Sequence, residues 1–231
     1  MAAAKKTILV TGSTRGIGLA FIAHYKQLGW HVIGAARDLA TAHKLLALKP
    51  HKIVQLDVSN EGSILETAKL LQDQPIDLLV NNAGIVVRDS LSRASKADLL
   101  KQFEVNAIGP LLVTRAFQPH LRAAAGTNGS ATVAHLSGIV ASIGGQGVPG
   151  LYGYSASKAA LNMFHVKLAK EFKKDKIISV SLHPGLVATE MMAGKGTPAN
   201  ESVAAVAKVI DAATIESSGK FLDYNGKEIA W

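Results

Sequence analysis

The chain has 231 residues, of which 48% are hydrophobic and none is cysteine. This length fits one large α/β domain with its own core, and the lack of cysteine excludes disulfide frameworks and thiolate metal sites. Lysine and arginine number 25 against 17 acidic residues, giving a net charge of +8. The positive charges are scattered, so we interpret them as a solvated basic surface and expect no nucleic-acid partner.

The apolar run at the N-terminus stops at Val10, which is too short for a signal peptide. No uninterrupted apolar stretch approaches the length that a bilayer crossing needs. We therefore expect a cytoplasmic protein that does not bind membranes.

Short β-branched runs alternate with longer helical patterns along the chain. In chain order we expect a strand at 7–10, a helix at 16–29, a strand at 31–36, a helix at 41–48, a strand at 52–58, a helix at 61–72, a strand at 76–84 that runs into a polar turn, a helical stretch at 95–121, a strand at 131–137, a helix at 150–174, a strand at 176–185, a helix at 201–213 and a last strand at 219–226. The strands are too apolar to face water on either side. The alternation predicts an α/β fold over residues 1–231: a single doubly wound Rossmann domain with a mostly parallel seven-stranded sheet and helices on both faces.

Ligands of doubly wound sheets bind beyond the carboxyl ends of the strands. Two glycine-rich loops, at 142–150 and 192–200, follow such strand ends. We expect residues 186–200 to form a substrate lid. The apolar side chains near this rim predict a modest apolar pocket, and they are Val86, Val87, Val148, Leu151, Met191 and Met192.

The sequence VTGSTRGIG lies between the first strand and the first helix, and it contains Gly12, Gly16 and Gly18. Glycines permit a tight turn and a close approach of backbone N–H groups to a phosphate at the helix N-terminus. A glycine triplet alone is weak evidence of binding, but this βαβ context predicts a dinucleotide site. The predicted contacts in this turn are Gly12, Ser13, Thr14, Arg15, Gly16, Ile17 and Gly18.

The end of the second strand distinguishes the two nicotinamide cofactors. An acidic residue there binds the ribose 2′-hydroxyl, whereas arginine accommodates a 2′-phosphate. Here Ala36 stands where the acid is expected, Arg37 follows it, and Arg15 adds a second cation from the glycine turn. Asp38 either pairs with Arg37 or takes the ribose itself. We expect NADP, with NADPH favoured over NADH.

Tyr154 and Lys158 stand four residues apart in a helical stretch, which places them on one face and one turn apart. A cation there favours the charged form of the phenol. By itself the pair is better explained as a surface tyrosine beside a surface lysine.

Six motifs occur in order: the glycine turn, NNAG at 81–84, Asn106 in VNAIG, a serine ending the fifth strand, YSASK at 154–158 and HPG at 183–185. With these motifs the chain resembles the classical short-chain dehydrogenase/reductase family over essentially its whole length. Its closing stretch, GKFLDYNGKEIAW, is similar to the branch that contains bacterial C-factor and carbonyl reductases.

The resemblance implies that Tyr154 is the general acid of a carbonyl reduction, with hydride arriving from the nicotinamide. Its pKa would have to fall from about 10 toward neutrality, which costs about 1.4 kcal/mol per unit. Lys158 and the positively charged nicotinamide would supply this, and Lys158 would also bind the nicotinamide ribose. Asn106 would hold a water that relays protons to the lysine; from the residues alone, it could instead satisfy a helix turn broken by Pro110.

The active-site serine departs from the family pattern. The family places it about thirteen positions before the tyrosine, whereas Ser137 precedes Tyr154 by seventeen. Alignment by strand end favours Ser137, because loops absorb insertions and strands do not. Ser142 is the alternative.

The remaining cofactor contacts implied by the resemblance follow the third, fourth and sixth strands: Asp57, Val58, Asn82, Ala83, Gly84, Pro184, Gly185, Val187 and Thr189. No histidine shows metal-ligand spacing with a carboxylate, so we expect no metal.

The sequence thus predicts an NADPH-dependent oxidoreductase that reduces a small hydrophobic aldehyde or ketone. The alternative is a C-factor-like signalling or regulatory protein that binds cofactor without needing turnover. The resemblance also allows a homodimer or homotetramer.

Overall fold

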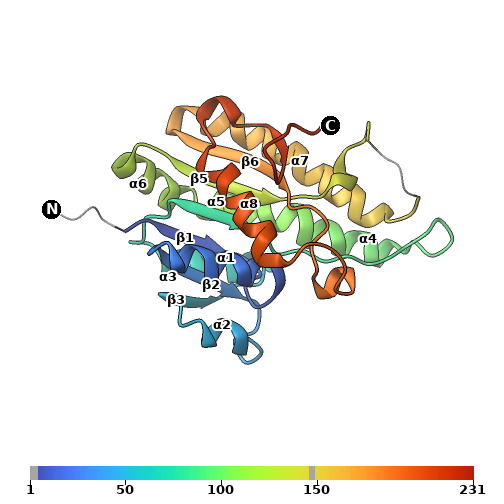
Figure 1. Cartoon of the computed structure of the whole chain (residues 1–231), viewed down its shortest axis with the longest axis horizontal. Coiled ribbons are helices and arrows are strands. Elements are labelled where there is room, and N and C mark those ends of the chain that lie inside the picture. The colour runs from blue at the N-terminus through green and yellow to red at the C-terminus, as the bar shows by residue number, and fades with distance from the viewer. Residues whose placement is uncertain (1–4, 146–148) are drawn as a thin grey trace.

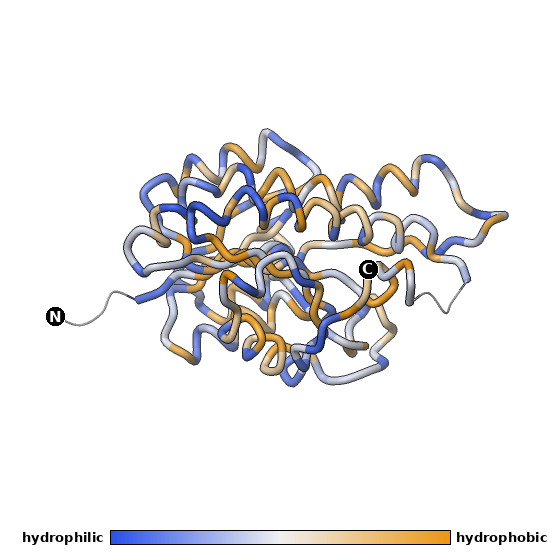
Figure 2. Tube along the Cα trace, turned by 90° about the horizontal axis from the view of Figure 1, so that it is seen from above, coloured by the Kyte–Doolittle hydropathy of each residue, from blue (hydrophilic) through white to orange (hydrophobic). Residues whose placement is uncertain are grey.

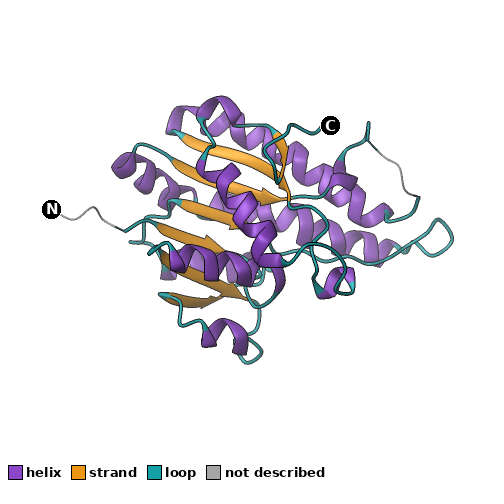
Figure 3. Ribbon diagram, viewed as in Figure 1, coloured by secondary structure: helices purple, strands orange, loops and turns teal. Residues whose placement is uncertain are grey.

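The computed structural model describes residues 5–145 and 149–231. The strands described there form one sheet in the order β3-β2-β1-β4-β5-β6-β7, and every adjacent pair is parallel. Figure 3 shows the strand arrows pointing the same way. The bounds are β1 (Thr7–Val10), β2 (His31–Ala36), β3 (Lys52–Gln55), β4 (Leu78–Asn81), β5 (Ala131–Leu136), β6 (Ile177–His183) and β7 (Phe221–Asp223). The predicted doubly wound fold is confirmed, and the sheet is parallel throughout rather than mostly so.

The helices cover both faces of this sheet, as Figure 1 shows. They are α1 (Gly16–Gln27), α2 (His43–Ala47), α3 (Glu61–Leu70), α4 (Lys96–Phe103), α5 (Gly109–Ala116), α6 (Gln118–Asn128), α7 (Tyr152–Phe172) and α8 (Ala199–Asp211). Helices α1 and α8 pack on one face, and α3, α5, α6 and α7 pack on the other. In Figure 2 the hydrophobic colour runs through the central strands, while many outer helical turns are hydrophilic.

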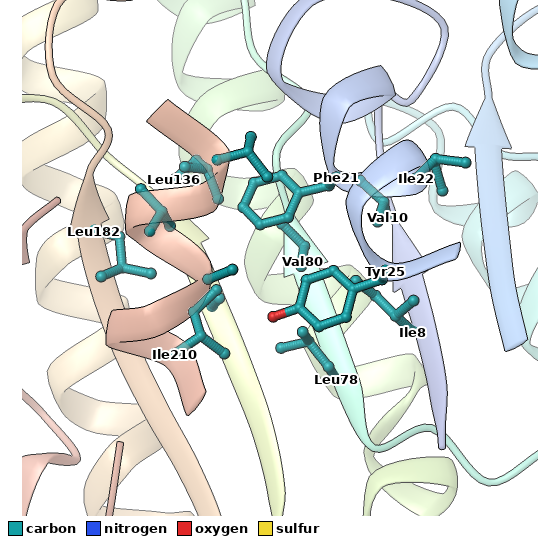
Figure 4. Close-up of a cluster of buried hydrophobic side chains, with 14 of the residues drawn as sticks. Ile8, Val10, Phe21, Ile22, Tyr25, Leu78, Val80, Leu136, Leu182 and Ile210 are labelled. Carbon is teal, nitrogen blue, oxygen red and sulfur yellow. The ribbon is translucent and has the colours of Figure 1, made fainter. Parts of the chain in front are cut away.

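The face under α1 and α8 is a continuous apolar core. Phe21 and Tyr25 of α1 lie against side chains of the central strands and against Ile210 of α8 (Figure 4). The strand residues on this face alternate along each strand, as a period of two requires, and they include Ile8, Val10, Leu78, Val80, Leu136 and Leu182. Burial of these large side chains holds the sheet beneath the site.

The opposite face becomes polar toward the carboxyl ends of the strands. Leu79 of β4, Val133 of β5 and Ile177 of β6 are apolar, but the next residues on that face are buried polar groups: Asn81, His135, Ser179 and Ser181. They bond to the covering helices. Asn81 Nδ2 donates to Thr114 Oγ1 of α5 at 2.9 Å. Ser181 Oγ donates to Asn162 Oδ1 of α7 at 2.7 Å, and Ser179 Oγ lies 2.9 Å from His165 Nδ1 of the same helix. A layer of polar side chains therefore lies beneath α7.

The predicted helical stretch at 95–121 is broken into separate segments. A π-helical turn, Glu104–Ile108, separates α4 from α5, and Pro110 opens α5. In a regular helix the N–H of residue 110 would donate to the carbonyl of Asn106, and proline has no N–H. The irregular turn expected near Pro110 is confirmed, and Asn106 lies within it.

The turn between β1 and α1 has no space for side chains at two of its glycines. A Cβ on Gly12, whose φ is +63°, would come within 2.8 Å of Ala83 Cα. A Cβ on Gly18 would come within 2.3 Å of the Gly12 carbonyl oxygen. The glycine turn is therefore packed directly against the segment that follows β4.

We predict that Gly18→Ala lowers the free energy of unfolding by about 2 kcal/mol or more, because the new methyl group overlaps backbone atoms. Gly126→Ala is the matched control, since that helical glycine has no atom within 4 Å of a built Cβ, and it should be neutral or stabilising by up to about 1 kcal/mol. Urea unfolding of both variants checks this. Equal stabilities of the two would contradict the close packing.

The burial of His165 makes the free energy of unfolding depend on pH. Burial lowers the pKa of His165 to about 4, against the opposing influence of the Gly219 and Lys220 carbonyl groups. Between about pH 6.5 and 4 the unfolded chain binds a proton that the folded chain does not, so the free energy of unfolding falls as pH falls, by up to about 3 kcal/mol from this group. Above pH 6.5 both states are neutral and the contribution is constant.

We predict that His165→Gln reduces this pH slope, measured by urea unfolding between pH 7 and 4. His43→Gln, at an exposed position, should leave it unchanged. A slope in His165→Gln as steep as in the wild type would show that other groups set the acid limit.

Candidate active site

Tyr154 and Lys158 lie on one face of α7, as the sequence predicts. Lys158 is 4% exposed, and its Nζ donates to the Leu136 carbonyl oxygen at the end of β5, at 2.7 Å. The same Nζ lies 5.9 Å from the centre of the Tyr154 ring. Lys158 is therefore buried against the end of the sheet and Tyr154 is half-buried beside it, so the two do not form a surface pair.

Burial shifts the pKa values of the two groups in opposite directions, because it disfavours the charged form of each. Burial lowers the pKa of Lys158 to about 8 and raises the pKa of Tyr154. The polypeptide alone therefore does not lower the pKa of the phenol; the predicted lowering assigns part of the effect to the positively charged nicotinamide. The reason is geometric: the ammonium donates to Leu136, and the phenol has lost water.

Ser137 follows Leu136 directly, and its position favours it over Ser142. Its Oγ is buried and has no hydrogen-bond partner among the described residues. The neighbouring Gly138 faces the phenol: a Cβ built there would lie 3.6 Å from the Tyr154 Oη. Ser142 Oγ, in contrast, accepts a hydrogen bond from the Gly145 N–H at 3.0 Å. A buried hydroxyl without a described protein partner, next in the chain to the residue that faces the phenol, is suited to bind a ligand oxygen.

Asn106 is fully buried and bonds mainly to the protein backbone. Its Nδ2 donates to the Ile85 carbonyl at 2.9 Å and to Ser157 Oγ at 3.0 Å, and its Oδ1 accepts from the Ile85 N–H at 2.8 Å. The side chain therefore clamps the segment after β4 to α7. A Cβ on Gly84 would lie 3.2 Å from Asn106 Oδ1 and 3.5 Å from Lys158 Nζ, so these groups surround one small space.

The start of α1 fits a phosphate. Arg15 precedes the helix, no side chain caps its first turn, and no acidic residue lies in that turn. Its backbone N–H groups and the positive end of the helix dipole are thus available to an anion. Gly16 lies close to Thr189, whose Cγ2 would be 3.2 Å from a Cβ there. The glycine turn and the loop after β6 therefore meet where a dinucleotide would lie, and the residues fit such a cofactor.

Three predicted cofactor contacts direct their side chains into the protein instead. Ser13 Oγ donates to the Ala35 carbonyl at 3.0 Å. Asn82 Nδ2 donates to the Thr11 and Gly12 carbonyl oxygens at 2.9 and 3.0 Å. Asp57 Oδ1 accepts from the N–H and the hydroxyl of Ser59. These side chains shape the turns through those atoms.

Of the two arginines predicted to share a phosphate, Arg15 is paired with a carboxylate. Arg15 Nε lies 3.2 Å from Glu190 Oε2 on the loop after β6. Arg37 is exposed at the end of β2, and Asp38 Oδ1 accepts the Ala40 N–H at 2.9 Å. Asp38 is thus engaged in a local turn, and Arg37 is left as the cation beside Ala36.

The loop after β6 closes on itself. The Thr197 N–H donates to the Leu186 carbonyl at 2.8 Å, and the Ala188 N–H donates to the Thr197 carbonyl at 2.8 Å. Gly185 has a φ of +82° and packs against the Tyr224 ring. Pro184, Gly185, Val187 and Thr189 occupy this loop or its entry, as predicted, whereas residues 199–200 of the predicted lid belong to α8.

Several contacts could not be read from sequence spacing. Asp89 bonds the first turn of α7, the Leu136 carbonyl holds Lys158, and Glu190 takes Arg15. Each joins segments far apart in the chain. The predicted pocket residue Val148, and part of the loop at 142–150, lie outside the described residues.

Within the described part of the chain, no three histidine or acidic side chains are grouped so that they could hold a metal ion. Over residues 5–145 and 149–231, no helix combines the length and the apolar character that a bilayer crossing requires.

Comparisons with known proteins agree with this geometry. A family model described as short chain dehydrogenase matches residues 6–200. C-signal of Myxococcus xanthus is 39% identical over 159 residues, covering 68% of this chain and 93% of that protein. Short chain dehydrogenase gsfK of Penicillium aethiopicum is 34% identical over 257 residues, covering 97% and 99%.

Two solved structures are similar over nearly the whole chain. An NADPH-bound carbonyl reductase from chicken fatty liver superposes with a TM-score of 0.91 at 31% identity, covering 99% of this chain and all of that one. Carbonyl reductase Sniffer of D. melanogaster has the same TM-score at 28% identity. The chain therefore belongs to the classical short-chain dehydrogenase/reductase family of oxidoreductases, near its C-factor and carbonyl reductase branch.

Proposed function

We propose that the protein is an NADPH-dependent reductase that converts a small hydrophobic aldehyde or ketone into an alcohol, with Tyr154 as general acid. One observation carries the proposal: the buried Ser137 hydroxyl, without a described protein partner, lies next to Gly138, which faces the Tyr154 phenol. A carbonyl oxygen placed between the two hydroxyl groups would receive a hydrogen bond from one and a proton from the other.

Each side chain around this oxygen has a different role in the proposed reaction. A bound reduced nicotinamide would supply the hydride. Tyr154, which burial keeps protonated, donates its proton to the substrate oxygen, and Ser137 orients that oxygen. Lys158, one turn away, stabilises the phenolate that remains. Asn106 holds the wall of the site through Ile85 and Ser157.

The end of β2 supports NADP over NAD. Ala36 offers no carboxylate to a ribose 2′-hydroxyl, Arg37 is exposed beside it, and the Asp38 carboxylate bonds the Ala40 N–H. A 2′-phosphate would form charge-assisted hydrogen bonds with the Arg37 guanidinium. The similar chicken carbonyl reductase binds NADPH.

We propose that the substrate side is apolar and of modest size. Val86 and Val87 follow β4, Leu151 precedes α7, and Met191 and Met192 lie on the loop after β6. We propose that this loop acts as the substrate lid. Association into a homodimer or homotetramer stays a prediction.

The second candidate is a signalling or regulatory role that needs cofactor binding but not turnover. The similarity to the protein called C-signal favours keeping it. The two candidates differ in whether Tyr154 chemistry is required.

We predict that Tyr154→Phe lowers the rate of NADPH oxidation by aldehydes or ketones at least about 100-fold, because the proton donor is removed. Cofactor affinity, measured by fluorescence titration, should change little. Tyr152→Phe is the matched control, since Tyr152 is exposed two residues away. Equal turnover by the wild type and Tyr154→Phe would contradict the proposed mechanism, and absence of turnover in both would favour the regulatory role.

We predict that Arg37→Ala weakens NADPH binding about 10- to 100-fold and leaves NADH binding nearly unchanged, because only the 2′-phosphate loses its charged partner. Arg122→Ala removes the same charge from the pair with Asp175 and should alter neither. Calorimetric titration with both cofactors provides the measurement. A parallel loss for NADH would mean that Arg37 does not read the 2′-phosphate.

A further inference from the structure

The first turn of α7 has no local cap. The backbone N–H groups at the start of a helix need partners from outside it. The preceding residue, Leu151, has a left-handed φ of +54° and makes no capping hydrogen bond, and the first turn contains no acidic residue. The first turn of the helix that carries Tyr154 therefore depends on a hydrogen-bond acceptor from another part of the chain.

The partner is Asp89, on the segment between β4 and α4. Its Oδ1 accepts the Tyr152 N–H at 2.7 Å and its Oδ2 accepts the Gly153 N–H at 3.0 Å. Asp89 is only 8% exposed. Gly150, with a φ of +79°, packs so closely that a Cβ there would come within 2.9 Å of the Asp89 carbonyl oxygen. The chain thus bends around Asp89 immediately before α7 begins.

The segment that carries Asp89 is itself anchored on the site. Asn106 bonds both the N–H and the carbonyl of Ile85. Gln102 Oε1 accepts the Val87 N–H at 2.9 Å, and Gln102 is fully buried. Asp89 therefore joins a fixed wall of the site to the helix turn that holds the phenol.

We propose that Asp89 is a positioning residue for Tyr154. Its carboxylate holds the N–H groups of the two residues that directly precede Tyr154, and so sets the place of the phenol relative to Ser137 and Lys158. A negative charge suits this role because it also complements the positive end of the α7 dipole. This inference rests on the proposed reductase activity.

A purely structural cap would change stability and nothing else, so the test compares two helix caps. Asp89→Ala removes the cap of α7, and Asn60→Ala removes the cap of α3, where Asn60 Oδ1 accepts the Ser63 N–H at 2.9 Å. We expect kcat to fall about 10- to 100-fold in Asp89→Ala, since small displacements of a reacting group have effects of this size. Asn60→Ala should keep wild-type kcat, and NADPH affinity should stay within about twofold in both.

Two further readouts separate positioning from stability. Asp89→Asn keeps one oxygen acceptor, so its kcat should lie between those of the wild type and Asp89→Ala. The solvent deuterium isotope effect on kcat should rise in the Asp89 variants, because proton transfer from a displaced phenol becomes more rate-limiting.

The inference is overturned if Asp89→Ala, in its folded fraction, turns over as fast as Asn60→Ala. If Asp89→Ala does not fold, a kcat of Asp89→Asn within about twofold of the wild type overturns it. Both results presuppose an active wild type. A wild type inactive toward every carbonyl tested would instead refute the proposed function.

Discussion

The site depends on one hydrogen bond, from the Lys158 ammonium to the Leu136 carbonyl at 2.7 Å. A buried cation needs such a partner, because its lost hydration is costly. The bond joins Lys158, in the first half of α7, to Leu136, the last residue of β5. Ser137 directly follows Leu136 in the chain. A single contact therefore relates the lysine, the serine and, one helical turn away, the phenol of Tyr154.

The two faces of the sheet support the buried lysine in different ways. The face under α1 and α8 is apolar to the ends of the strands and supplies the burial that stabilises the fold. The face under α7 gives up apolar contacts near the strand ends for hydrogen-bonded polar groups such as His135 and Ser181. Burial above all, and then the nearby His165 and Lys158, lower the pKa of His135, so that histidine stays neutral beside the cation. The polar layer of the interior therefore lies directly beneath the helix that carries Tyr154 and Lys158.

The features that could be predicted from the sequence are those that depend on local patterns of residues. Strand periodicity and the βαβ order gave the fold, the spacing of Tyr154 and Lys158 gave a shared helix face, and Pro110 gave the broken helix. Side-chain directions were not predictable, because they depend on partners distant in the chain. Arg15 pairs with Glu190 and Asn82 bonds the glycine turn, and no spacing links those residues. Asp89 was missed for the same reason, since the helix that it caps begins 63 residues later.

The charges around Tyr154 also bear on when the phenol becomes acidic. The polypeptide raises its pKa by burial, so a proton is present for reduction but is held firmly. The Lys158 ammonium is oriented to Leu136, and its effect on the phenol acts across 5.9 Å to the ring. The acidity that proton transfer needs is therefore not stored in the resting protein. In the proposed reaction this acidity would develop with the charge on the substrate oxygen, where Ser137 and Lys158 would stabilise the transition state more than the ground state.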